Sequence, residues 1–476
     1  MKNTALLVAT AAASVAAVGI AEIPREQVST SSQPSTSDPG FVSFPIYHRS
    51  VSKPILKRNT DVTIYNISSV SYLIQLSIGT PGQQVKVAID TGSDELWVNP
   101  NCTAVKSQDQ RAECIADGQY NPGQSSTSQV STTSNNIPYG KGDVNITYYK
   151  DSISMSNSTD PSRPQIKGIS LTNVIFGVAT SSKDLNEGIM GLGYGDGVNL
   201  RYNNMVDSLF LQNVTKSRAF SVALGSAEAS NSGVISFGGV DTKKFSGKLG
   251  QMPILGPQGK EEIRRYWVPM DSIAMSKNGG NKTYSGGNIP IVIDSGSTLS
   301  YLPSSVVTAM AMDANALWNS EGGVYFVKCD KMPADASFDF SFNNGSFRIS
   351  VPWRNFFWNT GGNTCVLGAV PIKSGSVTAL LGDSFMRSVY TVFDQTSNMV
   401  FMAPYANCGS NEQMIPASPS GAAANFTGEC SPGQGLPDPT PQKNAAGKAS
   451  GEPSKFEFWA CAAVLVVGHL VFGMLL

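Results

Sequence analysis

One short segment occurs twice in this chain, with about two hundred residues between the copies. The first copy is VAIDTGSDELWV, residues 87–98, and the second is NIPIVIDSGSTLSYLP, residues 288–303. In each, a run of strand-forming residues ends on an aspartate, Asp90 or Asp294, which a hydroxyl residue and a glycine follow at once. Aspartate and glycine are poor strand residues, so we expect each strand to end there. The repetition predicts two related halves, each with one carboxyl group at a strand end.

A second pair of segments occurs in the same order. EGIMGLGYG, residues 187–195, follows the first aspartate, and ALLGDSF, residues 379–385, follows the second. Around them, short segments with alternating apolar and polar residues, such as YLIQLSIG, are separated by Gly, Asn and Ser turns. Good helical patterns are few, and the best are 201–213 and 304–317. We therefore expect a mainly β protein with two similar lobes, residues 59–245 and 246–408.

The chain has two histidines, His48 and His469, and neither lies in the two predicted lobes. This excludes Ser-His-Asp and Cys-His nucleophilic sites and an HExxH zinc site from the lobes. No phosphate-binding loop or dinucleotide fingerprint follows a strand. The formal net charge of -1 argues against nucleic-acid binding. If the lobes form an enzyme, carboxylates are its acid–base groups, and we expect no cofactor and no metal.

Two matched aspartates have a chemical use that needs neither histidine nor metal. Carboxyl groups about 3 Å apart cannot both ionise, so such a pair holds one proton over a range of acid pH. The ionised member takes a proton from a water molecule while the protonated member donates to a peptide carbonyl. Thr91 and Ser295 would join the two loops through hydroxyl hydrogen bonds, while Gly92 and Gly296 would permit tight turns and close backbone approach.

The N-terminal end has the composition of sorting and processing segments. Residues 1–21 combine a lysine, an apolar run and small residues, which predicts a signal peptide. A Ser/Pro-rich stretch follows, and Lys57-Arg58 precedes the first strand-like run. We therefore interpret residues 22–58 as a propeptide that is released at a dibasic site.

The C-terminal end has a different composition. Residues 409–444 are rich in Ser, Pro, Gly and Ala and predict a stalk, too poor in large apolar residues to fold alone. Residues 445–476 have the layout of a GPI-attachment signal that is removed, with Asn444 as the attachment residue and Ser450 as the alternative. A membrane-spanning helix is the other interpretation of the terminal apolar run.

Cysteines and glycosylation sequons agree with secretion. Cys461 lies in the removable tail, which leaves six cysteines. Pairing neighbours would give Cys102–Cys114, Cys329–Cys365 and Cys408–Cys430, although sequence alone does not fix the connectivity. Eight Asn-x-Ser/Thr sequons are candidate glycosylation sites: Asn66, Asn101, Asn145, Asn157, Asn213, Asn281, Asn344 and Asn425.

The ordered motifs give the chain a family resemblance. From Tyr72 to Cys408 it contains, in order, YLIQLSIGTPGQ, VAIDTGSDELWV, FGVA, EGIMGLGYG, GVISFGGVD, VIDSGSTLSYLP and LLGDSFMRSVYTVFD. It resembles pepsin-type aspartic proteases, and with its C-terminal signal it is most similar to the fungal, yapsin-like, GPI-anchored ones. The resemblance implies a bilobal β fold with pseudo-twofold related lobes. It also implies a cleft for an extended peptide under a hairpin flap, no metal or cofactor, and a monomer.

The resemblance implies a role for each matching residue. Asp90 and Asp294 become the catalytic pair, and Ser93 and Ser297 match hydroxyls that bond to these aspartates. The flap matches residues 137–153. Within it, Tyr139 is the flap tyrosine with Trp97 as its indole partner, and Gly140 and Lys141 complete the flap tip.

Two flap residues depart from the family pattern. Ile146 stands where a glycine is usual, inside the Asn145 sequon, and Lys141 stands where many fungal relatives have an acidic residue. A cation there would repel Lys or Arg in the substrate by about 1 kcal/mol near a surface. Asp143, together with Asp94 and Glu95 if they face the cleft, would counter it. We expect a cleavage preference that is not strictly dibasic.

The expected function is that of a secreted endopeptidase active at acidic pH. Its place is the cell surface, GPI-anchored at the plasma membrane or carried into the cell wall. One alternative is a surface glycoprotein with the same fold and no catalysis. Another is a soluble vacuolar or secreted protease whose terminal tail serves some other purpose.

Overall fold

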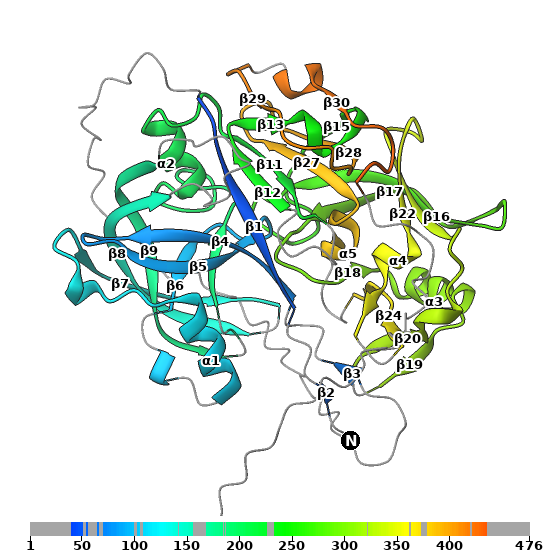
Figure 1. Ribbon diagram of the computed structural model, residues 1–476, viewed down its shortest axis with the longest axis horizontal. Helices are drawn as coiled ribbons and strands as arrows, with labels where there is room; N and C mark the ends of the chain where they lie inside the picture. The colour runs from blue at the N-terminus through cyan, green and yellow to red at the C-terminus, as the bar shows by residue number, and fades with distance from the viewer. Residues whose placement is uncertain are drawn as a thin grey trace, which may run out of the picture. The chain divides into compact units, whose positions relative to one another are not determined.

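The structure is a computed structural model (Figure 1), and it describes residues 40–50, 54–55, 64–65, 70–99, 102–104, 108–140, 142–155, 168–183, 185, 187–225, 233–320, 322–360, 363–372, 378–418 and 421–435. These residues all belong to the first of two units into which the chain divides, Met1–Pro439 and Thr440–Leu476. Several predicted features lie outside the described residues: the signal peptide, Lys57-Arg58, Lys141, the sequons at Asn66, Asn101 and Asn157, and the GPI residues Asn444 and Ser450.

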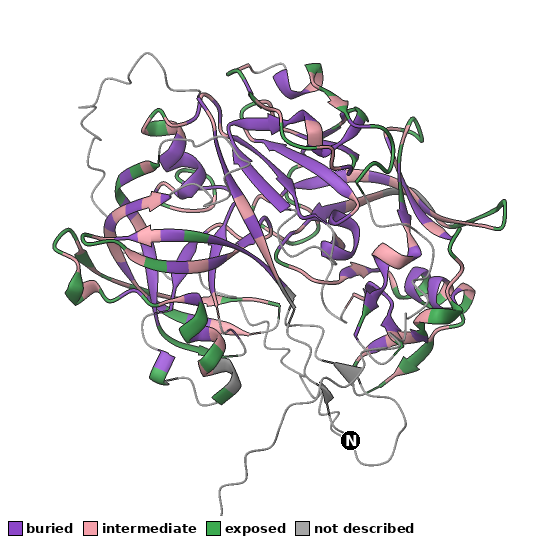
Figure 2. Cartoon of the chain, viewed as in Figure 1, coloured by how far each residue is buried: buried purple, intermediate pink, exposed green. Residues whose placement is uncertain are grey.

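A sheet of thirteen strands supports the first aspartate. Segments such as QQVKVAID form its strands because alternate side chains face opposite sides of the sheet. Figure 2 shows many of these strands largely buried. In sheet order the strands are β15 (Gly250–Pro253), β28 (Met399–Pro404), β27 (Val389–Asp394), β11 (Ala219–Ala223), β12 (Gly233–Phe237), β1 (Val42–Ser50), β4 (Val70–Ile78), β5 (Gln83–Asp90), β10 (Gly188–Gly191), β6 (Leu96–Val98), β9 (Ile169–Lys183), β8 (Asp143–Met155) and β7 (Gln129–Pro138).

This sheet includes strands from both predicted lobes. β15, β27 and β28 come from residues 246–408, and β27 pairs directly with β11 from residues 59–245. Stacked rings join the same two strands, with the Phe220 and Phe393 centroids 5.0 Å apart. The two lobes therefore share a continuous sheet.

The proposed propeptide contributes a strand to the middle of this sheet. β1 pairs with β12 along its first half and with β4 along its second half. Val42, Phe44 and Ile46 are each 2% exposed or less and belong to the main hydrophobic core. In the full chain, residues 42–50 are thus an integral part of the fold.

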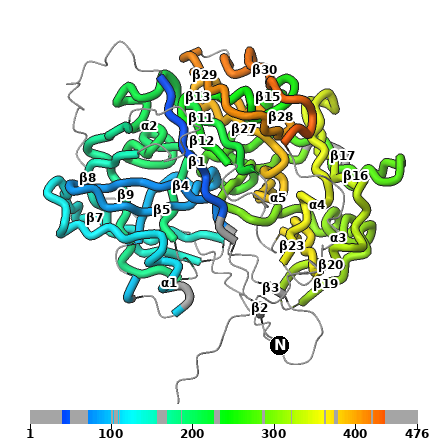
Figure 3. The backbone as a smooth tube through the Cα atoms, viewed as in Figure 1, coloured from blue at the N-terminus to red at the C-terminus, as the bar shows by residue number. Residues whose placement is uncertain are grey.

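A seven-stranded sheet supports the second aspartate. Its order is β22 (Phe347–Pro352), β21 (Ser337–Phe342), β16 (Trp267–Lys277), β17 (Gly280–Ile293), β26 (Leu380–Leu381), β18 (Ser300–Leu302) and β25 (Ala369–Pro371). The long hairpins β7–β8 and β16–β17 can be followed in Figure 3. A smaller sheet has the order β19 (Leu317–Asn319), β20 (Val324–Lys328), β24 (Thr364–Val366) and β23 (Trp358–Asn359).

Three further pairings each join two strands, and two of them correct the boundary of the predicted stalk. β29 (Glu412–Met414) pairs with β13 (Gly239–Asp241), β30 (Thr427–Glu429) pairs with β14 (Ser246–Lys248), and β2 (Pro54–Ile55) pairs with β3 (Ile64–Tyr65). Ile415 is fully buried in a second apolar cluster, and Cys430 forms a disulfide with Cys408. Because these contacts hold residues 412–430 against the lobes, a stalk starting at residue 409 is wrong in its first part.

Among the described residues helices are few, as expected. They are α1 (Gln108–Asp117), α2 (Met205–Leu211), α3 (Ser304–Asp313), α4 (Trp353–Phe356) and α5 (Asp383–Met386), with 3-10 turns at Cys102–Ala104, Pro122–Gln124, Thr242–Lys244, Cys329–Lys331 and Ala422–Asn425. α2 and α3 lie inside the two predicted helical segments. α2 begins later than predicted because the Asn204 side chain caps it, accepting from the Asp207 N–H at 3.1 Å. Helix α1 is not predicted from the sequence, because its residues QDQRAECIAD have little apolar periodicity.

Candidate active site

The two aspartates stand at equivalent strand ends. Asp90 is the last residue of β5, and Asp294 directly follows β17. Each strand has a short parallel neighbour formed by the second repeated segment, β10 beside β5 and β26 beside β17. The Leu192 N–H donates to the Asp90 carbonyl at 2.8 Å, and the Asp294 N–H donates to the Leu381 carbonyl at 3.0 Å. The repeats seen in the sequence are therefore structurally equivalent supports.

The same segments also hold the residues that follow each aspartate. The Gly193 N–H donates to the Ser93 carbonyl at 2.9 Å, and the Asp383 N–H donates to the Ser297 carbonyl at 2.8 Å. These bonds fix both turns through the backbone, so their shape depends little on side-chain conformation. Glycine is needed in both segments because a Cβ on Gly193 would collide with Asp94, and one on Gly382 would collide with the Ser297 carbonyl.

Reciprocal hydrogen bonds join the two turns. The Thr91 N–H donates to Ser295 Oγ at 3.2 Å, and the Ser295 N–H donates to Thr91 Oγ1 at 2.9 Å. The Thr91 hydroxyl then donates to the Ile293 carbonyl at 2.9 Å, and the Ser295 hydroxyl donates to the Ile89 carbonyl at 3.1 Å. Both hydroxyl residues thus have the linking position expected from the sequence.

The glycines after Thr91 and Ser295 allow the carboxyl groups to meet. A Cβ on Gly92 would lie 2.5 Å from Asp294 Oδ1, and a Cβ on Gly296 would collide with the Asp90 carboxyl group. Real Cβ atoms do not approach oxygen so closely, so each glycine provides space for the opposite aspartate. As a result, the carboxyl groups of Asp90 and Asp294 lie within hydrogen-bonding reach of each other.

The two carboxyl groups have different hydrogen-bond partners. Asp90 is 6% exposed and accepts from the Gly92 N–H at 2.8 Å and the Ser93 hydroxyl at 2.5 Å. Asp294 accepts from the Gly296 N–H at 2.9 Å. The Ser297 hydroxyl, expected to match Ser93, instead donates to the Leu299 carbonyl at 2.8 Å. A hydroxyl has one proton to donate, so the expected Ser297–Asp294 bond is absent here.

This asymmetry agrees with the electrostatics of the pair. Burial, reinforced by the nearby Asp90 carboxylate, raises the pKa of Asp294 to about 7. The Ser93 hydroxyl donates a hydrogen bond to the Asp90 carboxyl group, whereas the Ser297 hydroxyl donates to a backbone carbonyl. Asp294 is therefore the member that holds the shared proton in acid, although the two groups titrate as a unit.

A hairpin carries the predicted flap residues. β7 and β8 pair up to Pro138 and Asp143, and the Tyr139 N–H closes the turn onto the Gly142 carbonyl at 2.7 Å. Trp97 Nε1 donates to the Tyr139 hydroxyl at 2.8 Å, the partnership expected for these two residues. Gly140 is exposed, and a Cβ there would meet no atom within 4 Å.

The unusual flap isoleucine is accommodated by the fold. Ile146 is 1% exposed and packs in a cluster with Trp97, Val144 and Tyr148. A Cβ on Gly177 would lie 2.5 Å from the Ile146 side chain, so a glycine on β9 provides the space that the larger flap residue fills. The departure from the family pattern therefore adds an apolar contact beneath the hairpin.

Comparison with known proteins decides the family. Residues 71–405 match the family described as eukaryotic aspartyl protease. The chain belongs to this family. The match includes both aspartate turns and the hairpin, and it makes the protein an aspartic-type endopeptidase with the expected mainly β, bilobal fold.

Several fungal proteases are similar to this protease along most of its length. A probable aspartic-type endopeptidase opsB of Aspergillus fumigatus is 30% identical, covering 79% of this chain and 78% of the relative. Aspartic proteinase yapsin-3 of Saccharomyces cerevisiae is 30% identical over 72% of this chain and 68% of the relative. Secreted aspartic protease 8 of Candida albicans is 33% identical over 74% and 80%, respectively.

A buried glutamate ties both flap strands to the body of the protease. Glu95 is 9% exposed and accepts from the Tyr148 hydroxyl at 2.6 Å and the Tyr202 hydroxyl at 2.8 Å. It also accepts from the Asn135 amide at 3.3 Å. Asn135 lies on β7 and Tyr148 on β8. Glu95 is thus occupied beneath the flap, and the suggestion that it faces a substrate cation gains no support.

A second carboxylate near the pair connects the lobes. Asp94 accepts from the Tyr194 N–H at 2.7 Å and from the Asn199 amide at 3.0 Å. That amide also donates to the Arg264 carbonyl at 2.7 Å, and Asn199 Oδ1 accepts from the Arg264 N–H at 2.9 Å. Burial raises the pKa of Asp94 to about 6. Only the tertiary structure assigns this linking role.

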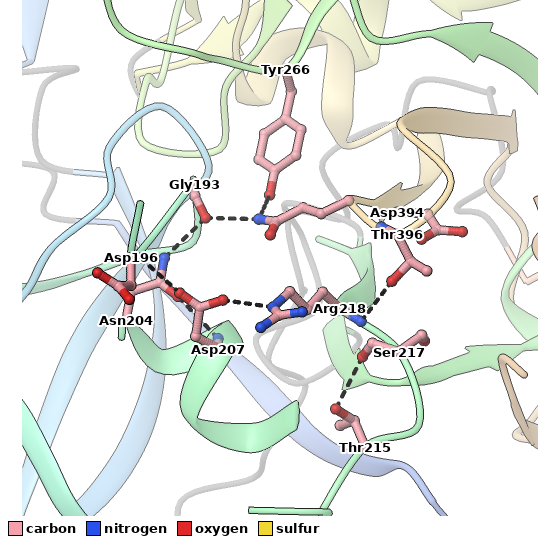
Figure 4. A network of polar contacts seen from close by, with 11 residues as sticks. Gly193, Asp196, Asn204, Asp207, Thr215, Ser217, Arg218, Tyr266, Asp394 and Thr396 are labelled. Atoms are coloured by element: carbon pink, nitrogen blue, oxygen red, sulfur yellow. Dashed lines mark hydrogen bonds and ion pairs between the residues drawn. The ribbon is translucent and has the colours of Figure 1, made fainter. Parts of the chain in front are cut away.

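A further link joins the loop after β10 to the other lobe, and its residues Gly193 and Tyr266 are labelled in Figure 4. The Gln395 side-chain amide donates to the Gly193 carbonyl at 2.8 Å and to the Tyr266 hydroxyl at 2.7 Å. The Tyr266 hydroxyl donates to the Leu192 carbonyl at 2.7 Å. The loop after β10, which supports the Asp90 turn, is therefore held by residues of the other lobe.

The cysteines and sequons of the described residues have the expected placement. Disulfides join Cys102 to Cys114, Cys329 to Cys365, and Cys408 to Cys430. The described sequon asparagines are all exposed: Asn145, Asn213, Asn281, Asn344 and Asn425. Within the described part of the chain, no helix has the length and apolar character needed to cross a membrane.

The buried carboxyl groups predict a protease that is more stable in acid than at neutral pH. The folded-state pKa is raised to about 6 at Asp94 and about 7 at Asp294, and burial also raises the pKa of Glu95 and Asp383. The folded state therefore keeps protons that the unfolded chain releases, so their stabilisation is full below about pH 4 and is lost as pH rises towards about 7. His48, whose pKa burial lowers to about 4, acts in the opposite direction below about pH 6.5.

On balance we expect the full chain to be more stable at about pH 5 than at about pH 7, by on the order of 3 kcal/mol. Urea unfolding followed by tryptophan fluorescence at both pH values measures this difference. Asp294→Asn should reduce it, since that substitution removes one of the groups responsible. Equal or greater stability at neutral pH would contradict the prediction.

Proposed function

We propose that this protease hydrolyses internal bonds of extended polypeptides at acidic pH, with Asp90 and Asp294 as its catalytic pair. The observation that carries the proposal is the pairing of two carboxyl groups at equivalent strand ends, in turns joined by the reciprocal Thr91–Ser295 hydrogen bonds. The two predicted lobes, residues 59–245 and 246–408, contain no histidine that could serve another class of hydrolytic site. The proposal needs no metal and no cofactor.

In the proposed mechanism the two carboxyl groups share one proton and have separate tasks. Ionised Asp90 takes a proton from a water molecule, whose oxygen attacks the peptide carbonyl carbon. Protonated Asp294 donates to the carbonyl oxygen, so a neutral tetrahedral diol forms. When the C–N bond breaks, the proton on Asp90 passes to the leaving nitrogen, and Asp294 regains its proton from the diol. Above about pH 7 the shared proton is lost and activity falls.

The β7–β8 hairpin is proposed to cover the bound peptide. Tyr139 and Gly140 stand at its tip, and the hydrogen bond from Trp97 holds the tyrosine in place. The charge of Lys141, a residue outside the described part of the chain, is proposed to disfavour basic side chains in the substrate. The resulting preference is not strictly dibasic, and a dominant requirement for Lys or Arg beside the scissile bond would refute it.

The proposed location is the cell surface, with a GPI anchor at Asn444 or Ser450. The composition of residues 445–476 supports this, as do relatives named as a yapsin and a secreted protease. Release from membranes by a phosphoinositide-specific phospholipase tests it. A protein that stays bound after treatment would favour a spanning helix, and one never bound to membranes would favour a soluble protease.

Residues 22–58 are proposed to be a propeptide cleaved after Arg58, and the mature enzyme is proposed to be a monomer.

The alternative of an inactive surface glycoprotein depends on the unusual flap. Since Gly177 accommodates Ile146, that argument loses its weight.

The test is hydrolysis of a peptide library by the expressed and processed protein, from about pH 3 to about pH 7, with and without pepstatin. Cleavage that is strongest in acid and blocked by pepstatin supports the proposal, and the cut sites report the preference that Lys141 sets. A folded, processed protein that cleaves nothing at any pH would favour the inactive glycoprotein.

A further inference from the structure

An arginine from the C-terminal lobe contacts the turn that carries Asp90. Arg265 lies two residues before β16, and its Nη1 donates to the Gly92 carbonyl. Gly92 is the residue at which an added Cβ would lie 2.5 Å from Asp294 Oδ1, and its N–H donates to Asp90 Oδ1 at 2.8 Å. The guanidinium group therefore bonds to the residue that lies against both members of the catalytic pair. Its side chain is 25% exposed, which leaves its charge incompletely screened by water.

The orientation of this guanidinium is fixed by a second contact. Arg265 Nε lies 3.0 Å from Glu261 Oε2, and Glu261 is 18% exposed. The other oxygen of Glu261 accepts from the Thr378 hydroxyl, which lies just before β26. Arg265 is thus held from its own lobe while it reaches across to the Asp90 turn.

The contact with Gly92 has an electrostatic consequence for the catalytic pair. The bonds that Asp90 and Asp294 accept from Gly92, Ser93 and Gly296 come from neutral donors. The positive charge of Arg265 favours the ionised form of Asp294, whereas the negative charge of Asp90 opposes it.

Other titratable groups surround the pair. Asp94 follows the Asp90 turn, Asp383 on α5 interacts with both aspartates, and Arg387 lies beside Asp383. Tyr301 on β18 interacts with Asp294, and Tyr139 on the flap interacts with Asp90. Arg265 combines a positive charge with a direct hydrogen bond to the turn of one catalytic aspartate.

We propose that Arg265 is a positioning residue of this active site: it holds the Asp90 turn from the opposite lobe, and its charge lowers the pH at which the catalytic pair loses its shared proton. The inference rests on the proposed function, because it assumes that the pair performs the reaction. It assigns a specific role to a residue outside the repeated aspartate segments.

The sign of the expected change follows from the charge. A cation stabilises a carboxylate, so removing it makes the pair hold its proton to higher pH. Arg265→Met should move the upper limb of the kcat/KM profile to higher pH by about 0.5–1 unit. It should also lower kcat by about tenfold, because the turn loses its clamp. Arg265→Lys keeps the charge, so its limb should stay close to wild type, while the loss of the guanidinium fork lowers kcat.

The matched control is Arg348→Met, which removes an exposed arginine on β22 and should leave the profile unchanged. Pepstatin titration counts folded active sites in every variant, so a folding defect is not read as a catalytic one. An upper limb at the same pH in wild type, Arg265→Met and Arg265→Lys would overturn the inference, since loss of a purely structural contact changes the rate and leaves the titration in place.

Calorimetric pepstatin binding across the same pH range separates this inference from the proposed function. A wild-type protein that binds pepstatin and cleaves no peptide refutes the proposed function. In that case, an upward shift in the pH at which binding weakens in Arg265→Met still supports the role of Arg265. A wild type that neither binds nor cleaves overturns both.

Discussion

Asp294→Asn is expected to lower kcat/KM by about 10²–10⁴-fold, the usual contribution of general acid–base catalysis. The amide still accepts the Gly296 N–H, which Asp294 accepts at 2.9 Å, so the turn keeps its shape. The substituted amide cannot supply the acidic proton that the Asp294 carboxyl group donates to the substrate carbonyl oxygen. Asp90→Asn should cause a loss of similar size, because the base that activates water is then missing.

The measurement is kcat/KM on a peptide selected from the library, near the acidic optimum, with the concentration of folded protein taken from unfolding curves. Asp330→Asn is the matched control, since it removes one carboxylate from an exposed site on a 3-10 turn. It should keep wild-type activity. If Asp294→Asn and Asp330→Asn behaved alike, the assignment of the catalytic pair would be wrong.

Phe44→Ala in the full chain is expected to lower the free energy of unfolding by about 3–5 kcal/mol. Phe44 lies on β1 inside the proposed propeptide and is 2% exposed. Its ring centroid lies 6.2 Å from that of Phe237, and its backbone register partner is Ile235 on β12. Truncation leaves a cavity between strands that the surrounding sheet cannot close.

Urea unfolding of the uncleaved protein measures this effect, with Val130→Ala as the control. Val130 is 68% exposed on β7, so its truncation should change stability by less than about 0.5 kcal/mol. An effect of Phe44→Ala as small as that of the control would show that β1 is not part of the folded core. If residues 22–58 leave after processing, the wild-type protein and the Phe44→Ala variant should be equally stable, because residue 44 is then no longer part of the protein.

Comparing wild type with Phe44→Ala after cleavage at Arg58 also tests what happens to β1 during maturation. Cleavage after Arg58 breaks the covalent link between β1 and β4, but it removes none of the pairing that holds β1 between β12 and β4. A stability difference that persists after cleavage would mean that the strand stays bound. Its disappearance would mean that residues 22–58 leave, together with the apolar surface that they bury.

Features encoded within short segments were predictable from the sequence. The two aspartate segments, the later Gly-rich repeats and the alternating strands predicted two related β halves, and both aspartates lie at the expected strand ends. Disulfide pairing between neighbouring cysteines also agrees with the structure. Such features follow from local periodicity, turn chemistry and repetition, which a single chain displays directly.

Tertiary structure alone decided features that depend on residues far apart in the chain. The Glu95 carboxylate accepts from Tyr148 under the β7–β8 hairpin, and Arg265 reaches Gly92 from the other lobe. The insertion of β1 into the main sheet and the packing of residues 412–430 are of the same kind. A hydroxyl or charged group has many possible partners with similar energies, and only the folded arrangement of both lobes selects one. The sequence by itself therefore determined the family of the fold and its paired carboxyl groups. The packing of the lobes decided which other side chains contact that pair and which charges lie near it.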